Sequence, residues 1–252
     1  MAWSLQGLAN KSLSYDKRAR FQQSDTGPDY KIDSPSFDQD NEPLPSAPVP
    51  RPGYGKLKRS LDIFGARAGL ILLIPLLLAI SVAIKATSRG PVIFRQERHG
   101  LNGAVFTIFK FRTMYTHLGD GSGVVQTVCG DPRVTRVGSF LRKSNFDELP
   151  QLLNVLKGEM SLVGPRPHVP GMLAAGIAYE EFDTRYMSRH QVRPGITGLA
   201  QINGCRGATT DPVSARKRLD YDLEYLEKQS LFLDLKIIAQ TIAREFFHGK
   251  GY

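Results

Sequence analysis

The feature that most constrains this chain is one long apolar run. Residues 68–84 are 17 consecutive side chains without a charge, with the sequence AGLILLIPLLLAISVAI. A straight helix of that length would reach about 26 Å at about 1.5 Å per residue, slightly less than the ~30 Å hydrocarbon core of a bilayer. Leucines would stand on all faces of this helix, which argues against a place in a soluble core. The run therefore predicts a segment that associates with a membrane.

Two features favour a segment that enters the membrane and returns to the same side. Pro75 lies at the middle of the run, where it removes a helical hydrogen bond and favours a bend. Both flanks are basic, and basic flanks prefer the cytoplasmic side. The basic residues are Lys56, Lys58, Arg59 and Arg67 before the run, and Lys85 and Arg89 after it. We predict one Pro-broken re-entrant membrane helix, with a straight span as the alternative.

The sequence around this run predicts three parts of the chain. Residues 1–55 are rich in Ser, Asp, Gln and Pro and can bury little apolar surface, so they are predicted to form a disordered N-terminal tail. This tail is not a secretory signal, because no apolar run follows Met1. Residues 56–90 are the predicted re-entrant anchor. Residues 91–252 are predicted to be a cytoplasmic catalytic domain, since they hold no further run long enough for a membrane.

The charge of the chain indicates anionic partners. Lys and Arg number 33 against 24 Asp and Glu, and the excess lies after residue 50, where the net charge is +11. Such an excess is typical of proteins that bind nucleic acid, an anionic membrane face or phosphorylated substrates. No basic stripe interleaved with aromatic residues is present, so a membrane-tethered nucleic-acid binder is the weakest of these readings. The two cysteines, Cys129 and Cys205, exclude a disulfide framework and a cysteine-rich zinc module.

The pattern after the anchor predicts an α+β fold that is mostly helical with a small β-hairpin. Apolar runs flank a turn built on Gly100, Asn102 and Gly103, which is typical of a hairpin. Period-two alternation on its second strand places Lys110 and Arg112 on one face. The glycine-rich stretch 116–131 is predicted to be a loop.

Four helices are expected further along the chain. They cover residues 148–157 with Asp147 as N-cap, 170–190, 212–228 after Asp211, and 231 onward after Ser230. The last helix carries an apolar stripe of Leu231, Leu235, Ile238 and Ile242. We expect this stripe to pack in the core, with an amphipathic helix at the membrane interface as the alternative.

The strongest candidates for chemistry are the adjacent carboxylates Asp147 and Glu148. At a helix N-terminus both can reach the space in front of the helix, which suits a phosphate or a carboxylate–metal cluster. An acidic cap without chemistry is the alternative. Several cations lie close to the pair in sequence: Arg133, Arg136, Arg142, Lys143 and Arg166. Arg166 stands between two prolines, which limit the backbone freedom of a side chain able to clamp a phosphate. The combination indicates phosphoryl chemistry with a divalent metal.

These motifs resemble those of the bacterial sugar transferases, the monotopic polyprenol-phosphate hexose-1-phosphate transferases that initiate exopolysaccharide assembly. The resemblance covers residues 56–252 almost continuously and is closest to a short form of the family. The motifs are KRSLD at 58–62, the run broken by Pro75, KFRTM at 110–114, DPRVTRVG at 131–138, LRKSNFDELPQLLNVLKGEMSLVGPRP at 141–167 and RPGITGLAQINGCRG at 193–207.

The resemblance implies a two-step reaction. The Asp147 carboxylate would attack the sugar-bearing phosphorus of a UDP-sugar and release UMP, and undecaprenyl phosphate would then take the phospho-sugar as undecaprenyl-diphosphate-sugar. Glu148 would hold Mg²⁺. The residues expected to bind phosphate are Arg166, Lys110, Arg112, Arg133, Arg136, Arg142, Lys143 and Arg206. An unperturbed Asp has a pKa of ~3.9, so it is ionised at pH 7 and needs no separate base to act as nucleophile.

The resemblance also implies a place at the cytoplasmic face of the bacterial inner membrane. Lys58 and Arg59, just before the apolar run, are expected to contact the polyprenyl phosphate or anionic lipid headgroups, or to act only as topology anchors. Asp62 is expected to pair with Lys58 along the helix.

Three assignments stay open in the sequence. Glucose is preferred over galactose on overall similarity alone, and a homodimer is one option for the assembly state. The alternative function is a non-catalytic, membrane-docked scaffold with the same fold. The adjacent carboxylates argue against a scaffold, because a scaffold needs neither of them.

Overall fold

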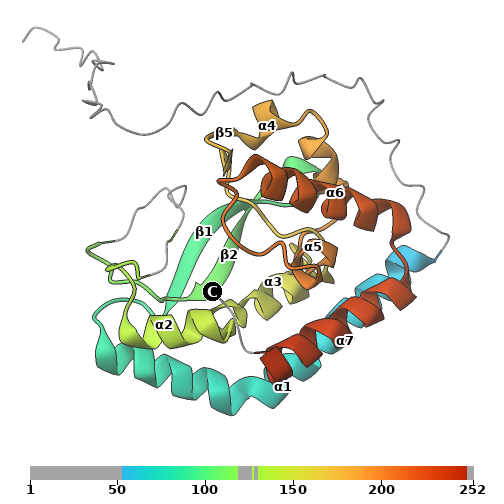
Figure 1. Cartoon of the computed structure of the whole chain (residues 1–252). Coiled ribbons are helices and arrows are strands. Elements are labelled where there is room, and N and C mark those ends of the chain that lie inside the picture. Colours follow the sequence, from blue (N-terminus) through green and yellow to red (C-terminus); the bar gives the residue numbers. More distant parts are fainter. Residues whose placement is uncertain (1–52, 119–126, 128–129, 249–252) are drawn as a thin grey trace, which may run out of the picture. The chain divides into compact units, whose positions relative to one another are not determined.

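The computed structural model describes residues 53–118, 127 and 130–248, without the side chains of 245–248 (Figure 1). Its α-helices are α1 (Tyr54–Thr87), α2 (Arg136–Lys143), α3 (Gln151–Lys157), α4 (Tyr179–Phe182), α5 (Leu199–Ile202), α6 (Pro212–Lys228) and α7 (Leu231–His248). Its 3₁₀ helices are η1 (Leu101–Gly103), η2 (Phe146–Glu148) and η3 (Tyr186–Gln191). Its strands are β1 (Ile93–His99), β2 (Val105–Phe111), β3 (Ser161–Val163), β4 (Leu173–Ala174), β5 (Ile177–Ala178) and β6 (Gly195–Thr197). The described part is mostly helical with small two-stranded sheets, as expected.

Two expectations from the sequence concern residues outside this description. The predicted disordered tail, residues 1–55, lies outside it up to residue 52, and so does most of the predicted loop after residue 118. The helix that contains the apolar run begins at Tyr54, slightly before the predicted start of the anchor.

Helix α1 is the one helix in the described residues that is long and apolar enough to cross a membrane, with a mean hydropathy of 2.4 in its most apolar window. The helix continues on both sides of Pro75, and Figure 1 shows it as two arms that meet at an angle. The proline therefore bends the helix without ending it, because it removes only one backbone donor. Many apolar side chains of α1 are exposed, including Phe64, Ile71, Leu72, Leu78 and Val82.

The two halves of α1 pack on different parts of the domain. In the first half, Ala66 belongs to a buried cluster with Leu152 and Val155 of α3. In the second half, Ile80 and Ile84 pack with Phe111 at the end of β2 and with Leu141 of α2. The body of the protein thus sits on one side of a bent apolar helix.

Polar contacts fasten the first half of α1 to the body. The Lys58 ammonium donates to Val163 O at 3.0 Å, to the Tyr225 hydroxyl at 3.1 Å and to Asp234 Oδ2 of α7 at 2.9 Å. Asp62 instead accepts hydrogen bonds from the β3 strand, so the expected Lys58–Asp62 helix pair is wrong. The pairing fails because Asp62 is itself buried, where Ser161 and Leu162 already donate to its carboxylate, and Lys58 meets the buried Asp234 instead.

The predicted hairpin is confirmed. Strands β1 and β2 pair antiparallel with Phe94 opposite Lys110 and Arg98 opposite Phe106. Asn102 has a φ of 54° in the connecting turn, a left-handed conformation that Asn tolerates better than most residues. Partners in an antiparallel pair point to the same face, so Arg98 and Lys110 share one side of the hairpin.

Strand β3 pairs in parallel with β6, and the chain leaves β3 directly into the Pro165–Pro167 segment. A Cβ on Gly164 would collide with the carbonyl of Arg193, and one on Gly195 would collide with the backbone of Gly164. Only glycine allows this close approach of the two segments. The approach holds the backbone that presents Arg166.

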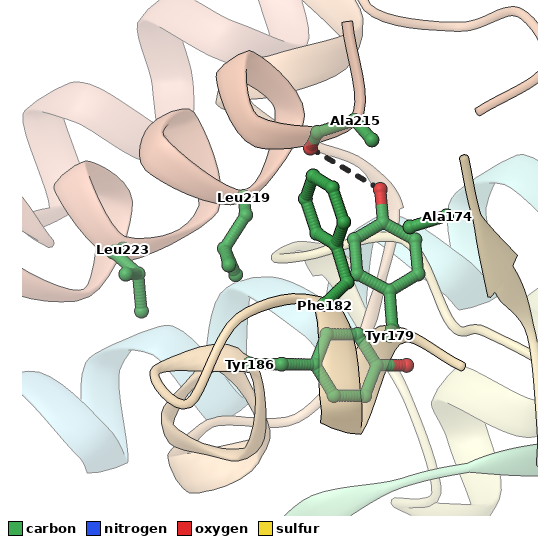
Figure 2. Packing of buried hydrophobic residues seen from close by; sticks show 7 residues of the cluster. All are labelled: Ala174, Tyr179, Phe182, Tyr186, Ala215, Leu219 and Leu223. Carbon is green, nitrogen blue, oxygen red and sulfur yellow. Dashed lines mark hydrogen bonds between the residues drawn. The ribbon is translucent and has the colours of Figure 1, made fainter. Parts of the chain in front are cut away.

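The predicted helix over residues 170–190 is wrong. The structure has the short β4–β5 hairpin there, followed by α4 and η3. Gly176 has a φ of 87°, which suits a turn and not a helix. The aromatic residues that suggested helical spacing, Tyr179, Phe182 and Tyr186, pack in a buried cluster against α6 (Figure 2). In this cluster the Tyr179 hydroxyl donates to Ala215 O at 3.2 Å.

Helices α6 and α7 begin where the sequence predicts. Asp211 accepts a hydrogen bond from the backbone N–H of Ser214, and Ser230 accepts one from that of Leu233. The expected core packing of the α7 stripe holds only in part, because Ile238 packs against a buried cluster while Leu235 and Ile242 are about half exposed. Asp234 faces the body to meet Lys58, and this contact turns part of the predicted stripe outward.

Candidate active site

The carboxylates Asp147 and Glu148 lie in η2, between α2 and α3, and both are buried. Asn145 precedes them with a φ of 54°, which turns the chain as it leaves α2. The predicted helix over 148–157 with Asp147 as its N-cap is therefore wrong at its start, because α3 begins only at Gln151. The tight 3₁₀ turn, and not a helix terminus, sets the position of the two side chains.

Two cations hold Glu148. The Lys110 ammonium lies 2.7 Å from Glu148 Oε1, and the Arg166 guanidinium donates to both carboxylate oxygens, at 2.5 Å and 3.0 Å. Burial alone would raise the pKa of Glu148, but the charges of Arg166 and Lys110 outweigh it and hold that pKa well below its usual range. Glu148 is therefore ionised and fixed in place.

Asp147 is in a different state from its neighbour. No hydrogen bond or ion pair from the described residues reaches its carboxylate. Burial raises the pKa of Asp147 to about 6; the Lys110 charge lowers it and the Glu148 charge raises it further. The pKa of Asp147 is thus higher than the ordinary value assumed from the sequence, yet its carboxyl group remains mostly ionised at pH 7. The two adjacent carboxylates therefore differ: Lys110 and Arg166 hold Glu148, whereas Asp147 has no hydrogen-bond or ion-pair partner among the described residues.

The other cations that were predicted to bind phosphate lie in several parts of the described structure. Arg142 lowers the pKa of Asp147, and its Nε donates to Thr113 Oγ1 at 2.9 Å. Arg133 is tied to Asp131 through a forked contact and lowers the pKa of that carboxyl to about 2. Arg136 and Lys143 are exposed on α2. Arg206 lies after α5, where its Nε donates to Gln201 O. Arg112 contacts Ser88 after the end of α1.

Lys58 and Arg59 are used within the protein. Besides the Lys58 contacts already described, Arg59 donates to the carbonyls of Val155 and Leu156 at the end of α3, at 2.7 Å and 2.9 Å. Such contacts satisfy carbonyls that the helix leaves without partners. Both cations thus join α1 to the body, a role that sequence reasoning missed. Their contact with polyprenyl phosphate or headgroups stays a prediction.

Sequence reasoning also missed Arg98. Its Nη1 donates to Pro167 O at 3.1 Å, and it lines a small cleft together with Lys110, Glu148, Gln151 and Arg166. Burial and the Arg166 charge lower the pKa of Arg98 to about 10. The signal was present in the hairpin pattern, because the predicted alternation places Arg98 on the face of Lys110.

Another missed residue positions Arg166 through its backbone. The Arg189 guanidinium donates to Arg166 O at 2.7 Å and pairs with Asp222 of α6 at 2.7 Å. The pair is almost wholly buried, so its geometry is well defined. Nothing in the local sequence identifies this contact, because its partners lie in three separate segments.

The geometry can be compared with what Mg²⁺ requires. Among the described residues no three His, Cys, Asp or Glu side chains gather as a metal-binding group. Mg²⁺ usually needs only one or two carboxylates, with water and substrate phosphates as its other ligands. Among the residues that the structure describes, none pairs with Asp147 and one donates to Oε2 of Glu148, so a lone pair stays available there. The carboxylate pair therefore fits this ion.

The arrangement defines the class of site. The buried carboxylate of Asp147, which has no partner in the described part of the chain, stands beside Glu148, with Lys110, Arg142 and Arg166 close by. Cations in this position reduce the repulsion between a carboxylate and an anionic phosphate and stabilise charge in phosphoryl transfer. Fold and site thus define a mostly helical domain on a long apolar helix, with a site suited to phosphoryl chemistry.

Comparison with known proteins identifies the family. The family model described as bacterial sugar transferase matches residues 54–248. The exopolysaccharide production protein PSS of Rhizobium leguminosarum bv. phaseoli is 51% identical over 196 residues, which cover 78% of this chain and 98% of that protein. The undecaprenyl-phosphate glucose phosphotransferase of Komagataeibacter xylinus is 50% identical over 195 residues, covering 77% of this chain and 37% of that protein.

A third relative extends the comparison. The UDP-glucose:undecaprenyl-phosphate glucose-1-phosphate transferase of Escherichia coli (strain K12) is 45% identical over 210 residues, covering 83% of this chain and 44% of that protein. The chain thus spans less than half the length of the last two relatives. The chain belongs to the bacterial sugar transferase family. This confirms the family that its motifs resemble and, with it, the class of enzyme.

Proposed function

We propose that this chain transfers a hexose-1-phosphate from a UDP-sugar to undecaprenyl phosphate, giving undecaprenyl-diphosphate-sugar and UMP. The observation that carries the proposal is the arrangement of two adjacent carboxylates. Lys110 and Arg166 clamp Glu148, and Asp147 beside it has no partner among the described residues. The names of the relatives support the same reaction. The product would be the first membrane-bound intermediate of exopolysaccharide synthesis.

In the first step, an Asp147 oxygen forms a bond to the phosphorus that carries the sugar. The bond from that phosphorus to the bridging oxygen breaks, and UMP leaves with the electron pair. Asp147 needs no general base, because its pKa of about 6 leaves it mostly ionised at pH 7. Its raised pKa also makes this carboxylate a better nucleophile than an ordinary aspartate.

In the second step, a phosphate oxygen of undecaprenyl phosphate attacks the same phosphorus. The bond between phosphorus and Asp147 breaks and the free carboxylate returns. A covalent intermediate lets two large anionic substrates use one site in turn. The cations stay in place through both steps, so the site needs little rearrangement as charge develops.

The cations have separate tasks in this scheme. Lys110 and Arg166, which both contact Glu148, would bind the phosphates of the UDP-sugar. Arg142 reduces the effect of negative charge at Asp147. Arg166 has a planar fork suited to phosphate, and Arg189 holds its backbone. Mg²⁺, bound by Glu148 and the phosphates, would add charge neutralisation at the transferred group. Asp147 stays available for attack.

We further propose that α1 is a re-entrant anchor at the cytoplasmic face of the bacterial inner membrane. Its bend and exposed apolar side chains support this placement, as do the basic residues on both flanks. Exposed apolar residues of α7, Phe232 and Leu235 among them, favour an interfacial position for that helix as well. The anchor would hold the site at the depth of the acceptor phosphate.

Glucose is the proposed sugar. Several relatives are named as glucose-1-phosphate transferases, and their identities of 45–50% exceed the 43% of an N-acetylgalactosamine phosphotransferase of Aeromonas hydrophila. Galactose is the second candidate.

The test is UMP release by the full chain in detergent with undecaprenyl phosphate and Mg²⁺. UDP-glucose, UDP-galactose and UDP-N-acetylglucosamine would be supplied separately. We expect release with UDP-glucose and its loss in Asp147→Asn, a variant of nearly equal shape. In cells, glycan synthesis by Asp147→Asn at the level of the native protein would favour the non-catalytic scaffold instead.

A further inference from the structure

Arg112 is a buried cation that the protein uses only in part. It is 5% exposed and directly follows β2, and its Nη2 donates to Ser88 O and Ser88 Oγ, both at 2.8 Å. Its Nε and Nη1 have no hydrogen-bond partner among the described residues. A buried donor without an acceptor costs about 1–3 kcal/mol, and more on a charged group. A guanidinium left in this state indicates an anion that comes from outside the chain.

Arg112 is among the residues that line a cavity of about 510 Å³ at the start of β1. The lining residues, mostly apolar, are Pro91, Val92, Ile93, Phe94, Arg95, Arg112 and Thr116. Gly90 makes room beside it, because a Cβ at this position would collide with Nη1 of Arg112. A cation at the edge of an apolar cavity suits a ligand with an anionic head and a hydrocarbon chain.

The cavity lies next to the candidate active site. Lys110, which contacts Glu148, is two residues before Arg112 on the same strand face, roughly 7 Å away along the backbone. Thr113, the next residue, accepts a hydrogen bond from Arg142, whose charge acts on Asp147. An anion on Arg112 would therefore lie near Lys110, which contacts Glu148, and near Ser88 after the end of the apolar helix.

We propose that Arg112 and this cavity bind the phosphate and the first isoprene units of the polyprenyl phosphate acceptor. The donor phosphates then occupy the separate cations around Glu148. The proposal rests on the proposed function, since it assigns a place to the second substrate. A phosphodiester headgroup offers related chemistry, but a buried guanidinium favours the more highly charged phosphate monoester.

The kinetic test separates the two substrates. Full-length protein in lipid nanodiscs would be assayed as Arg112→Gln, as Arg112→Lys and as Lys217→Gln, an exposed cation on α6 that serves as the control. One assay measures UMP release in a single turnover without acceptor, and the other measures product against undecaprenyl phosphate concentration. We expect Arg112→Gln to raise the KM for undecaprenyl phosphate at least tenfold, with single-turnover release changed less than twofold.

Two kinetic results would overturn the proposal. One is an unchanged KM for the acceptor. The other is an equal loss in both assays, which would place Arg112 with the donor or in the fold. Arg112→Lys keeps the charge but not the fork, and we expect it to lie between Arg112→Gln and the native protein. Lys217→Gln should match the native protein in both assays.

A binding test stands independently of catalysis. Thermal unfolding of Asp147→Asn protein would be compared with and without Arg112→Gln, in nanodiscs containing either undecaprenyl phosphate or added phosphatidylglycerol. We expect undecaprenyl phosphate to raise the Tm only where Arg112 is present. An equal rise with phosphatidylglycerol would assign the site to headgroups and contradict the proposal. Failure of the proposed function, with no UMP release from any donor, leaves this binding result readable by itself.

Discussion

Arg189 and Asp222 form an ion pair with 2.7 Å between Nη2 and Oδ2, and their side chains are 1% and 3% exposed. The same Nη2 donates to the carbonyl of Arg166. A buried pair of this kind links the α6 helix to the backbone of the residue that clamps Glu148. The fold and the site therefore share one contact that is buried away from solvent.

Removing one partner of this pair should be costly. Asp222→Asn leaves the Arg189 charge buried without compensation, and we expect it to lower the free energy of unfolding by about 3–5 kcal/mol. The matched control is Asp220→Asn, since Asp220 also pairs with an arginine but is 51% exposed. That control should lose less than about 1 kcal/mol. Denaturant unfolding in detergent measures both, and similar losses in the two variants would contradict the assignment.

The fork of Arg166 should matter more than its charge. Arg166→Lys keeps the charge but cannot donate to both oxygens of Glu148 or clamp a phosphate bidentately. We expect kcat/KM for the UDP-sugar to fall roughly 10- to 100-fold, from the loss of one charged hydrogen bond. Arg193→Lys, at an exposed arginine that contacts Gly158 O, is the control and should stay within about twofold. An unaffected Arg166→Lys enzyme would refute the clamp.

Acid should destabilise the protein through two buried histidines. Burial and the Arg189 charge lower the pKa of His190 to about 3, and the same causes lower the pKa of His168 well below its usual value. The unfolded chain binds protons near pH 6.5, so this stability is complete above that pH and is lost as the pH falls below it. Between pH 7.5 and 5.5 we expect a loss of about 1.4 kcal/mol for each histidine.

Two variants isolate this histidine contribution. In His190→Phe the loss between pH 7.5 and 5.5 should shrink by about 1.4 kcal/mol. His117→Phe, at an exposed position, should leave the loss unchanged. Asp147 acts in the opposite direction, since its raised pKa favours the folded state as the pH falls below about 6. Comparing variants in the same buffers removes that contribution, and identical slopes for all three proteins would contradict the prediction.

Pro75 should decide the path of α1 through the membrane. In the native chain, reporters fused to the N-terminus and the C-terminus are expected on the same side. Pro75→Ala restores a backbone N–H that can donate to Ile71 O and straightens the helix. We expect part of the population to place the N-terminal reporter on the opposite side. Ile74→Ala is the control and should keep both reporters together; native reporters on opposite sides would refute the re-entrant anchor.

Local features of the sequence were sufficient for several elements. The apolar run predicts α1, because such a run can be placed in only a few environments whatever surrounds it. Turn residues and period-two alternation predict the β1–β2 hairpin, and Asp211 and Ser230 mark the starts of α6 and α7. The carboxylate pair was found in the same way, since its residue types and neighbouring cations are adjacent along the chain.

Elements that depend on distant partners could not be found locally. The segment before η3 has aromatic residues at helical spacing, yet it forms a hairpin and short turns because those rings pack on α6. The outward face of α7 follows from the Lys58–Asp234 contact, whose partners are 176 residues apart. Arg189 contacts Arg166 and Asp222 only because folding brings these three distant segments together.

The sequence by itself therefore determined the long apolar helix, the hairpin, the family and the carboxylate pair, because each is encoded in a short segment. Only the tertiary structure decided that Lys110 and Arg166 hold Glu148 while Asp147 has no partner among the described residues. The same holds for Arg112, which lines a cavity at the start of β1 and has two nitrogens without a hydrogen-bond partner among the described residues. The physical reason is that pKa values and unsatisfied donors depend on burial and on charges brought together by folding.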